Sequence, residues 1–170
     1  LNNVSILKFI GYNESSFEKA LKLVKQLKAD LGGTELYQPL QVIFNEQNKM
    51  GQKQVFIMTD GEVSDPQPIL NLVSQNSNEN RCFTIGIGRG CDAGLVESLA
   101  RLSAGKCDFL QEGDSISEKV IPQLQSSLFG IIKSVQIHVE NNEKFQMSPY
   151  PLITISSKGS FIIYLRLKNI

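Results

Sequence analysis

The sequence has 170 residues, with 17 lysines and arginines against 17 aspartates and glutamates, so its formal net charge is zero. Hydrophobic residues make up 41% of the chain, which is enough for a core and excludes a disordered acidic or basic tail. The balanced charge argues against nucleic acid as a partner, because neutralising phosphates requires an excess of lysine and arginine. No stretch approaches the roughly 20 apolar residues of a membrane helix, so we expect no membrane span.

The cysteines say little about the compartment. Cys82, Cys91 and Cys107 are odd in number and lack the spacing of a metal site, so we expect free thiols and no disulfide framework. Free thiols slightly favour an intracellular location. Two Asn-X-Ser tripeptides near the amino end match the glycosylation acceptor of secreted proteins and leave an extracellular location open.

Two helices are predicted in the first part of the chain. Apolar residues recur at three- and four-residue steps from Ser15 to Ala29, which indicates an amphipathic helix, and Ser15 with Glu18 fits a capping box. After a turn, a second helical pattern runs from about Thr34. At that position Thr34 either caps the helix or offers its hydroxyl as a ligand.

Strands and helices then alternate along the chain. The apolar run Val55–Thr59 predicts a strand buried on both faces, and Cys82–Ile87 predicts a second buried strand. The remaining elements are helices near residues 69–73 and 95–102, a strand near 106–110, and a helix from Ser115, where Ser115 and Glu118 fit a capping box. This alternation predicts an α/β fold: a doubly wound, mainly parallel sheet with helices on both faces.

The pattern changes at about Ser134. Apolar and polar residues alternate over residues 135–140 and again over Phe161–Leu167, which predicts a short antiparallel β segment. Such a segment is too small to bury a core of its own. We therefore divide the chain into an α/β unit at residues 1–133 and a β-rich segment at residues 134–170.

Two motifs combine oxygen-bearing side chains with glycine. In Gly32-Gly33-Thr34 the glycines permit a tight turn before a helix start. In Thr59-Asp60-Gly61 the aspartate follows a predicted parallel strand, at the sheet end where open α/β folds bind ligands. A hydroxyl and a carboxylate that converge there are hard ligands suited to Mg²⁺, Mn²⁺ or Ca²⁺. Each motif alone is also explained as a helix cap or a turn.

No catalytic set is apparent. The stretch Gly86-Ile87-Gly88-Arg89-Gly90 suggests a dinucleotide site, but Cys91 stands where that fingerprint requires glycine, so we interpret it as a sharp strand-to-helix turn. His138, the one histidine, has no nearby nucleophile with a supporting acid, and we expect it at the surface. We predict that the chain is not itself an enzyme.

The order and spacing of these motifs resemble the von Willebrand factor type A domain. That family has GGT before a helix, TDG at the end of the next strand, and a TIGIG-type motif at the end of the following one, which here are Gly32-Gly33-Thr34, Val55–Gly61 and Phe83–Gly88. More narrowly, the stretch Lys28–Leu36 resembles the subgroup of inter-alpha-trypsin inhibitor heavy chains and vault poly(ADP-ribose) polymerase. In that subgroup a β-rich segment follows the A domain.

The resemblance implies a metal-ion-dependent adhesion site. In the family its ligands come from a D-x-S-x-S turn, a threonine after the glycine pair, and the aspartate of TDG. Carried over to this chain, Thr34 and Asp60 are the metal ligands, and Gly32, Gly33 and Gly61 shape the site. The D-x-S-x-S turn is absent from the sequence, so the remaining ligands are expected upstream of the first residue.

We therefore expect an adhesion-type protein–protein interaction module within a larger protein. Its metal would leave a position open for an acidic side chain of a partner. The strand at residues 55–59 would be an open apolar edge, so a missing upstream segment of the same domain is a further expected partner. Two alternatives stay open: a structural scaffold domain with a degenerate metal site in a multi-protein assembly, and a non-catalytic part of a larger enzyme such as an ADP-ribosyl polymerase.

Overall fold

A computed structural model describes residues 11–27, 33–46, 51–132, 135, 137, 145–148, 155–156 and 162–167. Gly32, His138 and most of the strand expected at residues 135–140 lie outside the described residues. The helices are α1 (Glu14–Gln26), α2 (Tyr37–Asn45), α3 (Gln67–Asn76), α4 (Ala93–Leu102) and α5 (Ile116–Ser127). The strands are β1 (Lys53–Thr59), β2 (Asn80–Ile87), β3 (Cys107–Leu110), β4 (Ile131–Ile132), β5 (Phe145–Ser148), β6 (Ile155–Ser156) and β7 (Tyr164–Leu167).

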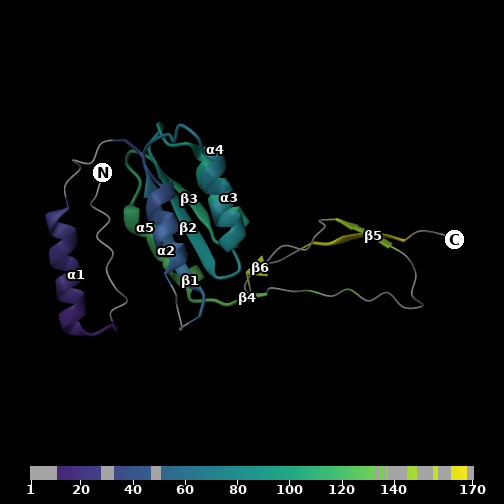
Figure 1. Cartoon of the computed structure of the whole chain (residues 1–170), viewed down its shortest axis with the longest axis horizontal. Helices are drawn as coiled ribbons and strands as arrows, with labels where there is room; N and C mark the ends of the chain where they lie inside the picture. The colour runs from purple at the N-terminus through teal and green to yellow at the C-terminus, as the bar shows by residue number, and fades with distance from the viewer. Residues whose placement is uncertain are drawn as a thin grey trace.

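The predicted parallel sheet is confirmed. Strands β1, β2 and β3 form one sheet in that order, and both pairings are parallel. Val55 lies opposite Cys82, and Thr84 lies opposite Cys107, so β2 is the central strand. Each strand is followed by a helix that returns along the sheet, as parallel pairing requires (Figure 1).

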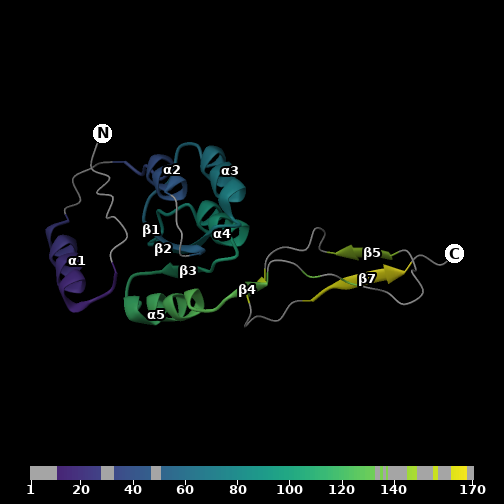
Figure 2. The same ribbon diagram turned by 60° about the horizontal axis from the view of Figure 1, so that its bottom comes forward.

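Helices cover both faces of this sheet, as the alternating pattern predicted. In Figure 2, α2, α3 and α4 lie on one face and α5 lies on the other. The main core fills the first face, where α4 contributes Leu95 and Leu99. The cluster is completed by side chains of the sheet and of α2 and α3: Leu40, Phe44, Val55, Ile57, Ile69, Val73 and Cys82.

The prediction that β1 is buried on both faces is wrong. Its burial alternates strictly, and Phe56 and Met58 keep 37% and 62% of their surface exposed. Strand β2 is buried over almost its whole length because it has neighbours on both sides. β1 is an edge strand among the described residues, and α5 lies over β2 and β3 and leaves the outer strand uncovered.

Helix α1 is capped by residues other than those predicted. Its N-cap is Asn13, whose side chain accepts a hydrogen bond from the Ser16 amide at 2.8 Å. The Ser16 hydroxyl in turn accepts from the Asn13 amide at 2.9 Å, so this pair forms the capping box expected of Ser15 and Glu18. No residue of α1 is buried, although Phe17 and its apolar neighbours line one face as predicted.

Two other predicted caps are also corrected. Helix α2 begins at Tyr37 with Leu36 as its N-cap, so Thr34 does not cap it. Ser115 does precede α5, but its side chain makes no capping hydrogen bond. The Glu118 amide bonds instead to the Ser115 backbone carbonyl at 3.1 Å. The expected capping box at α5 is therefore not formed, and Thr34 is left available for another role.

A buried lysine from β1 binds the carbonyl groups at the carboxyl end of α2. Lys53 is only 8% exposed, yet its ammonium group lies among the last carbonyls of that helix. It donates to the Ile43 oxygen at 2.6 Å and to the Phe44 oxygen at 3.3 Å, and also to the oxygen of Glu46. Carbonyls at a helix end lack intrahelical partners and carry partial negative charge, so a cation there satisfies them. This contact explains how an edge strand can bury a lysine in its first position.

The cysteines are free thiols, as expected. Cys82 is buried, while Cys91 and Cys107 are half-buried. Burial raises the pKa of the Cys82 thiol to about 11, against a smaller opposing effect of its hydrogen bond with Ser103. Cys82 therefore behaves as a small apolar core residue.

An antiparallel segment follows the α/β unit, as predicted. Strand β4 pairs with β6, and β5 pairs with β7, both antiparallel. Phe145 lies opposite Leu167 and Ser148 opposite Tyr164. Figure 2 shows the β5–β7 ribbon lying away from the parallel sheet. Among the described helices, none has the length and apolar character needed to cross a membrane.

Candidate functional site

Three loops meet at the carboxyl end of the parallel sheet. They are the residues before α2, which include Thr34, the turn Thr59-Asp60-Gly61 after β1, and the glycine-rich turn after β2. Their closeness follows from the topology, because parallel strands all end at the same edge of a sheet. The sequence motifs predict that the loops of Thr34 and Asp60 converge here, and they give the turn after β2 no part in the site. The contacts described below place all three loops against one another.

Thr34 lies directly against Gly61. A Cβ atom added to Gly61 would lie 2.3 Å from the Thr34 hydroxyl oxygen, which is far inside van der Waals contact. Gly61 is therefore required at this point so that the threonine hydroxyl can approach the turn that carries Asp60. Gly33, just before Thr34, has φ of +54°, a left-handed conformation that favours glycine. Gly61 is thus explained by the close approach of Thr34, and Gly33 by its left-handed backbone conformation.

The carboxylate of Asp60 is exposed at this end of the sheet. Asp60 is the first residue after β1, and it follows Thr59, which is buried. The Thr59 hydroxyl accepts a hydrogen bond from the Gly61 amide at 3.4 Å, which closes the turn around the aspartate. The site therefore offers one half-buried hydroxyl, from Thr34, and one exposed carboxylate, both hard oxygen groups.

The turn after β2 also contacts the loop that carries Asp60. A Cβ atom on Gly90 would lie 3.3 Å from the Asp60 backbone oxygen, so this turn packs against the aspartate's main chain. Gly88 has φ of +72°, and Asp92 then caps α4 by accepting from the Leu95 amide at 2.9 Å. This geometry agrees with a sharp strand-to-helix turn, the interpretation preferred to a dinucleotide motif.

Gly86, within β2, has a separate packing role. A Cβ atom at this position would lie 2.8 Å from both the Cys91 sulfur and the Phe109 ring. Those two side chains fill the space above the strand, and only glycine leaves room for them. The half-buried Cys91 is thereby held against the end of β2.

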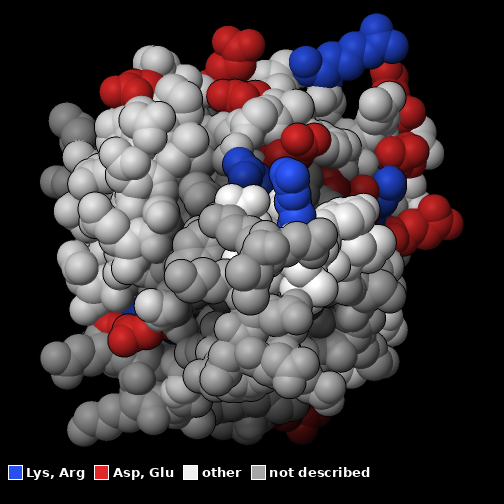
Figure 3. All heavy atoms as spheres, turned by 90° about the vertical axis from the view of Figure 1, so that its right-hand side faces the viewer, with Lys and Arg blue, Asp and Glu red and all other residues white. Residues whose placement is uncertain are grey.

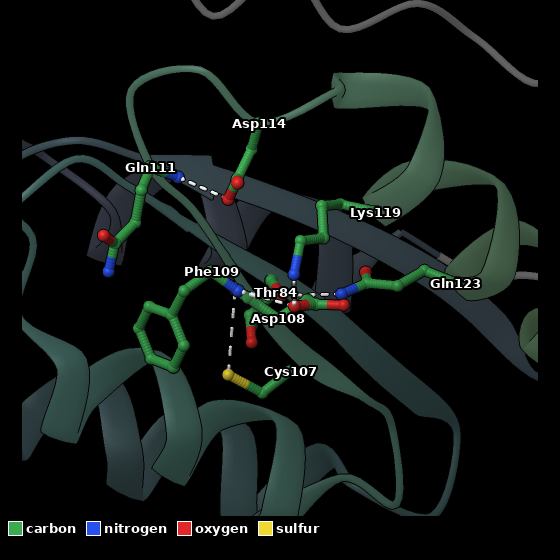
Figure 4. A network of polar contacts seen from close by, with 8 residues as sticks. All are labelled: Thr84, Cys107, Asp108, Phe109, Gln111, Asp114, Lys119 and Gln123. Carbon is green, nitrogen blue, oxygen red and sulfur yellow. Dashed lines mark hydrogen bonds and ion pairs between the residues drawn. The ribbon is translucent and has the colours of Figure 1, made fainter.

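A network of polar contacts joins α5 to the sheet on the opposite face (Figure 4). The Lys119 ammonium lies 3.1 Å from an Asp108 carboxylate oxygen, and the pKa of Lys119 is raised by its hydrogen bond and charge attraction to that aspartate. The buried Gln123 donates its amide hydrogen to the Thr84 carbonyl at 2.9 Å. The sequence reasoning missed these contacts, although Lys119 and Gln123 are four residues apart and so share one helix face.

The loop between β3 and α5 is closed by a local contact. The Gln111 amide donates to an Asp114 carboxylate oxygen at 2.9 Å. In Figure 4 this contact lies above the Asp108–Lys119 pair and away from it. Asp114 is therefore engaged in its own turn.

Charge is mixed on the face of the molecule that Figure 3 shows. Figure 3 shows acidic and basic side chains interleaved over the upper part of the visible face. Within the described residues, no group of three or more histidine, cysteine, aspartate or glutamate side chains is placed to hold a metal ion. A divalent cation that takes six or more oxygen ligands would therefore need donors beyond the Thr34 hydroxyl and the Asp60 carboxylate.

Comparison with known proteins agrees with the resemblance that the motifs indicated. The family model of the von Willebrand factor type A domain matches residues 4–109. Von Willebrand factor A domain-containing protein 5A of Rattus norvegicus is 38% identical over 120 residues, which cover 70% of this chain and 15% of that protein. The Homo sapiens protein of the same name is 36% identical over 129 residues, covering 75% of this chain and 16% of that protein.

More distant relatives extend the match into the β-rich segment. A von Willebrand factor A domain-containing protein of Dictyostelium discoideum is 28% identical over 159 residues, which cover 93% of this chain and 17% of that protein. The chain thus spans only about a sixth of the length of these relatives. No solved structure gives a significant match.

Proposed function

Because the chain belongs to the von Willebrand factor type A domain family, we propose that it binds a protein partner through a divalent cation held at the carboxyl end of its sheet. Domains of this family are generally protein-interaction modules, usually without catalytic activity. The cation of the proposal is Mg²⁺, or Mn²⁺ or Ca²⁺, with Thr34 and Asp60 among its ligands. An acidic side chain of the partner completes its coordination.

The observation that carries the proposal is the approach of Thr34 to the Thr59-Asp60-Gly61 turn. The residues present fit the cation in chemical type, since a threonine hydroxyl and a carboxylate are hard oxygen donors. They also fit in placement, because Gly61 leaves the space that brings the hydroxyl beside the aspartate's turn. When bound, the cation would supply a positive charge and an open position for a carboxylate.

The remaining ligands must come from outside this pair. We infer that a further segment of the polypeptide, water and the partner provide them, since the chain covers a small part of its relatives. The role of Thr34 and Asp60 is then to hold two of the cation's positions. The exposure of Asp60 leaves the approach from solvent open to a partner.

Calorimetric titration of the full-length protein with Mg²⁺ and with Mn²⁺ tests the metal part. Asp60→Asn and Thr34→Val should each weaken binding at least about tenfold, because each removes an oxygen ligand or its charge. Glu79→Gln is the matched control, since this exposed carboxylate lies at the opposite end of the sheet, just before β2. Unchanged affinity in both site variants would refute the metal site and favour a scaffold domain with a degenerate site.

The partner part requires a separate measurement. Protein partners captured by the full-length protein in Mg²⁺ should be released by EDTA and should not be captured by the Asp60→Asn variant. If partners are still captured in EDTA and by the Asp60→Asn variant, the interaction does not depend on the cation. Circular dichroism of Asp60→Asn must match that of the unchanged protein, so that loss of folding is not mistaken for loss of the site.

A further inference from the structure

A buried arginine lies at the other end of the sheet, away from the candidate site. Arg81 is the second residue of β2 and is only 2% exposed. Helices that connect parallel strands run opposite to the strands, so their carboxyl ends gather at the strands' amino ends. Arg81 is therefore placed where α4 and α5 both end.

The guanidinium group binds the backbone at both helix ends. Its Nε atom donates to the Ala104 carbonyl at 3.0 Å, just after α4, and its Nη1 atom donates to the Phe129 carbonyl at 2.9 Å, just after α5. Carbonyls at helix ends carry partial negative charge, which makes a cation a favourable partner. The guanidinium carbon also lies 4.9 Å from the centre of the Phe83 ring, within the range of a cation–π contact.

Among the described residues, no carboxylate forms an ion pair with this arginine. Burial lowers the pKa of its guanidinium, but arginine is so strongly basic that the group keeps its charge at neutral pH. The two carbonyls and the aromatic ring therefore stabilise the buried positive charge, in place of a carboxylate. Losing either carbonyl would leave a buried donor without its acceptor, which is costly.

We propose that Arg81 is a clamp that fixes the direction in which the chain leaves the α/β unit for the antiparallel segment. Phe129 stands between the end of α5 and the start of β4, so the bond to its carbonyl holds the exit of the chain against the central strand. Apolar packing of α5 is limited, since Ile121 and Leu124 are about half exposed. The middle of the helix is joined to the sheet by the polar contacts of Lys119 and Gln123, and its end by the bond from Arg81. A movement that carries Phe129 away from the sheet must break the Arg81–Phe129 bond.

Hydrogen exchange measured by mass spectrometry on the unchanged protein gives the first test. Helix ends ordinarily fray and exchange rapidly. The clamp predicts that the amides of Leu128 and Phe129 exchange as slowly as those in the middle of α5. Rapid exchange at these two positions would overturn the proposal, and this result does not depend on any variant folding.

The Arg81→Gln variant gives the second test. The glutamine nitrogen takes the place of Nε and can still reach the Ala104 carbonyl, but nothing replaces the Nη1 bond to Phe129. Exchange over residues 126–132 should rise about tenfold or more, while exchange in α4 and β1 stays unchanged. Arg101→Gln, an exposed arginine in the last turn of α4, is the control and should change neither region.

Two results would contradict the clamp. One is unchanged exchange over residues 126–132 in Arg81→Gln. The other is a uniform rise over the whole chain, which would show that Arg81 acts only on overall stability. Small-angle scattering adds a readout of position, because release of the exit should broaden the distribution of distances between the α/β unit and the antiparallel segment.

Discussion

The substitution Gly105→Ala should be among the most damaging single changes in this chain. Gly105 follows α4 and donates its amide to the Ala100 carbonyl at 2.9 Å, which ends the helix. The end of this helix lies against the central strand. A Cβ atom on Gly105 would lie 1.8 Å from the Cys82 carbonyl oxygen and 2.6 Å from the carbonyl carbon.

No local movement relieves this overlap. A Cβ position is set by the backbone, so no side-chain rotation moves it away. Cys82 has no exposed surface and lies in the strand between β1 and β3, with its amide bonded to the Ser103 hydroxyl at 2.8 Å. Either α4 must shift outward by more than about 1 Å or the central strand must distort, and close-packed interiors resist both. We expect a loss of at least about 4 kcal/mol in the free energy of unfolding.

Urea unfolding followed by far-ultraviolet circular dichroism measures this loss. A loss of about 4 kcal/mol corresponds to a Tm lowered by roughly 16–30 °C for a unit of about 100 residues. Gly130→Ala is the matched control, because a Cβ atom there meets no atom within 4 Å, and it should change stability by about 0.5 kcal/mol or less. If Gly105→Ala lies within about 1 kcal/mol of that control, the reasoning from backbone overlap is refuted.

Two further predictions concern the same region. Ala104 has φ of +53°, a left-handed conformation that is unfavourable for alanine, so Ala104→Gly should raise the free energy of unfolding by about 0.5–1 kcal/mol in the same urea assay, and a loss of stability would count against it. The raised pKa of Cys82 means that the folded chain holds a proton which the unfolded chain releases above pH 9, so stability should fall between about pH 9 and pH 11. Cys82→Ala should remove this part of the pH dependence, and an identical slope in both proteins would show that another group is responsible.

Much of the fold was readable from local patterns. Apolar runs and helical periodicity placed the three strands of the parallel sheet and helices α1 to α5, and the strand–helix alternation required parallel pairing. The family assignment also followed from motif order, and the comparisons bear it out. The subgroup, the division at residue 133 and the metal ligands stay predictions.

The errors have a common origin. The run Val55–Thr59 is apolar on both faces, and nothing within it tells whether a helix covers the second one. Helix starts were similarly misplaced, because several Ser, Thr and Asn residues near each start can cap it and tertiary placement chooses among them. The local sequence therefore does not determine which face of a strand is covered or which residue caps a helix.

The buried polar residues were beyond sequence reasoning. Lys53 and Arg81 stand at the starts of strands, where their long charged side chains suggest a solvated surface. Only the folded chain brings the carboxyl ends of α2, α4 and α5 to the same end of the sheet, and these carbonyls are what the two cations bind.

Taken by itself, the sequence determined the order of elements, the parallel sheet and the two motifs that meet at its carboxyl end, because periodicity and turn chemistry are local properties. Tertiary structure alone decided which face of β1 is covered, why Gly61 must stand beside Thr34, and where the buried charges find partners. Those outcomes depend on contacts between segments distant in the chain, and such contacts leave no pattern within either segment.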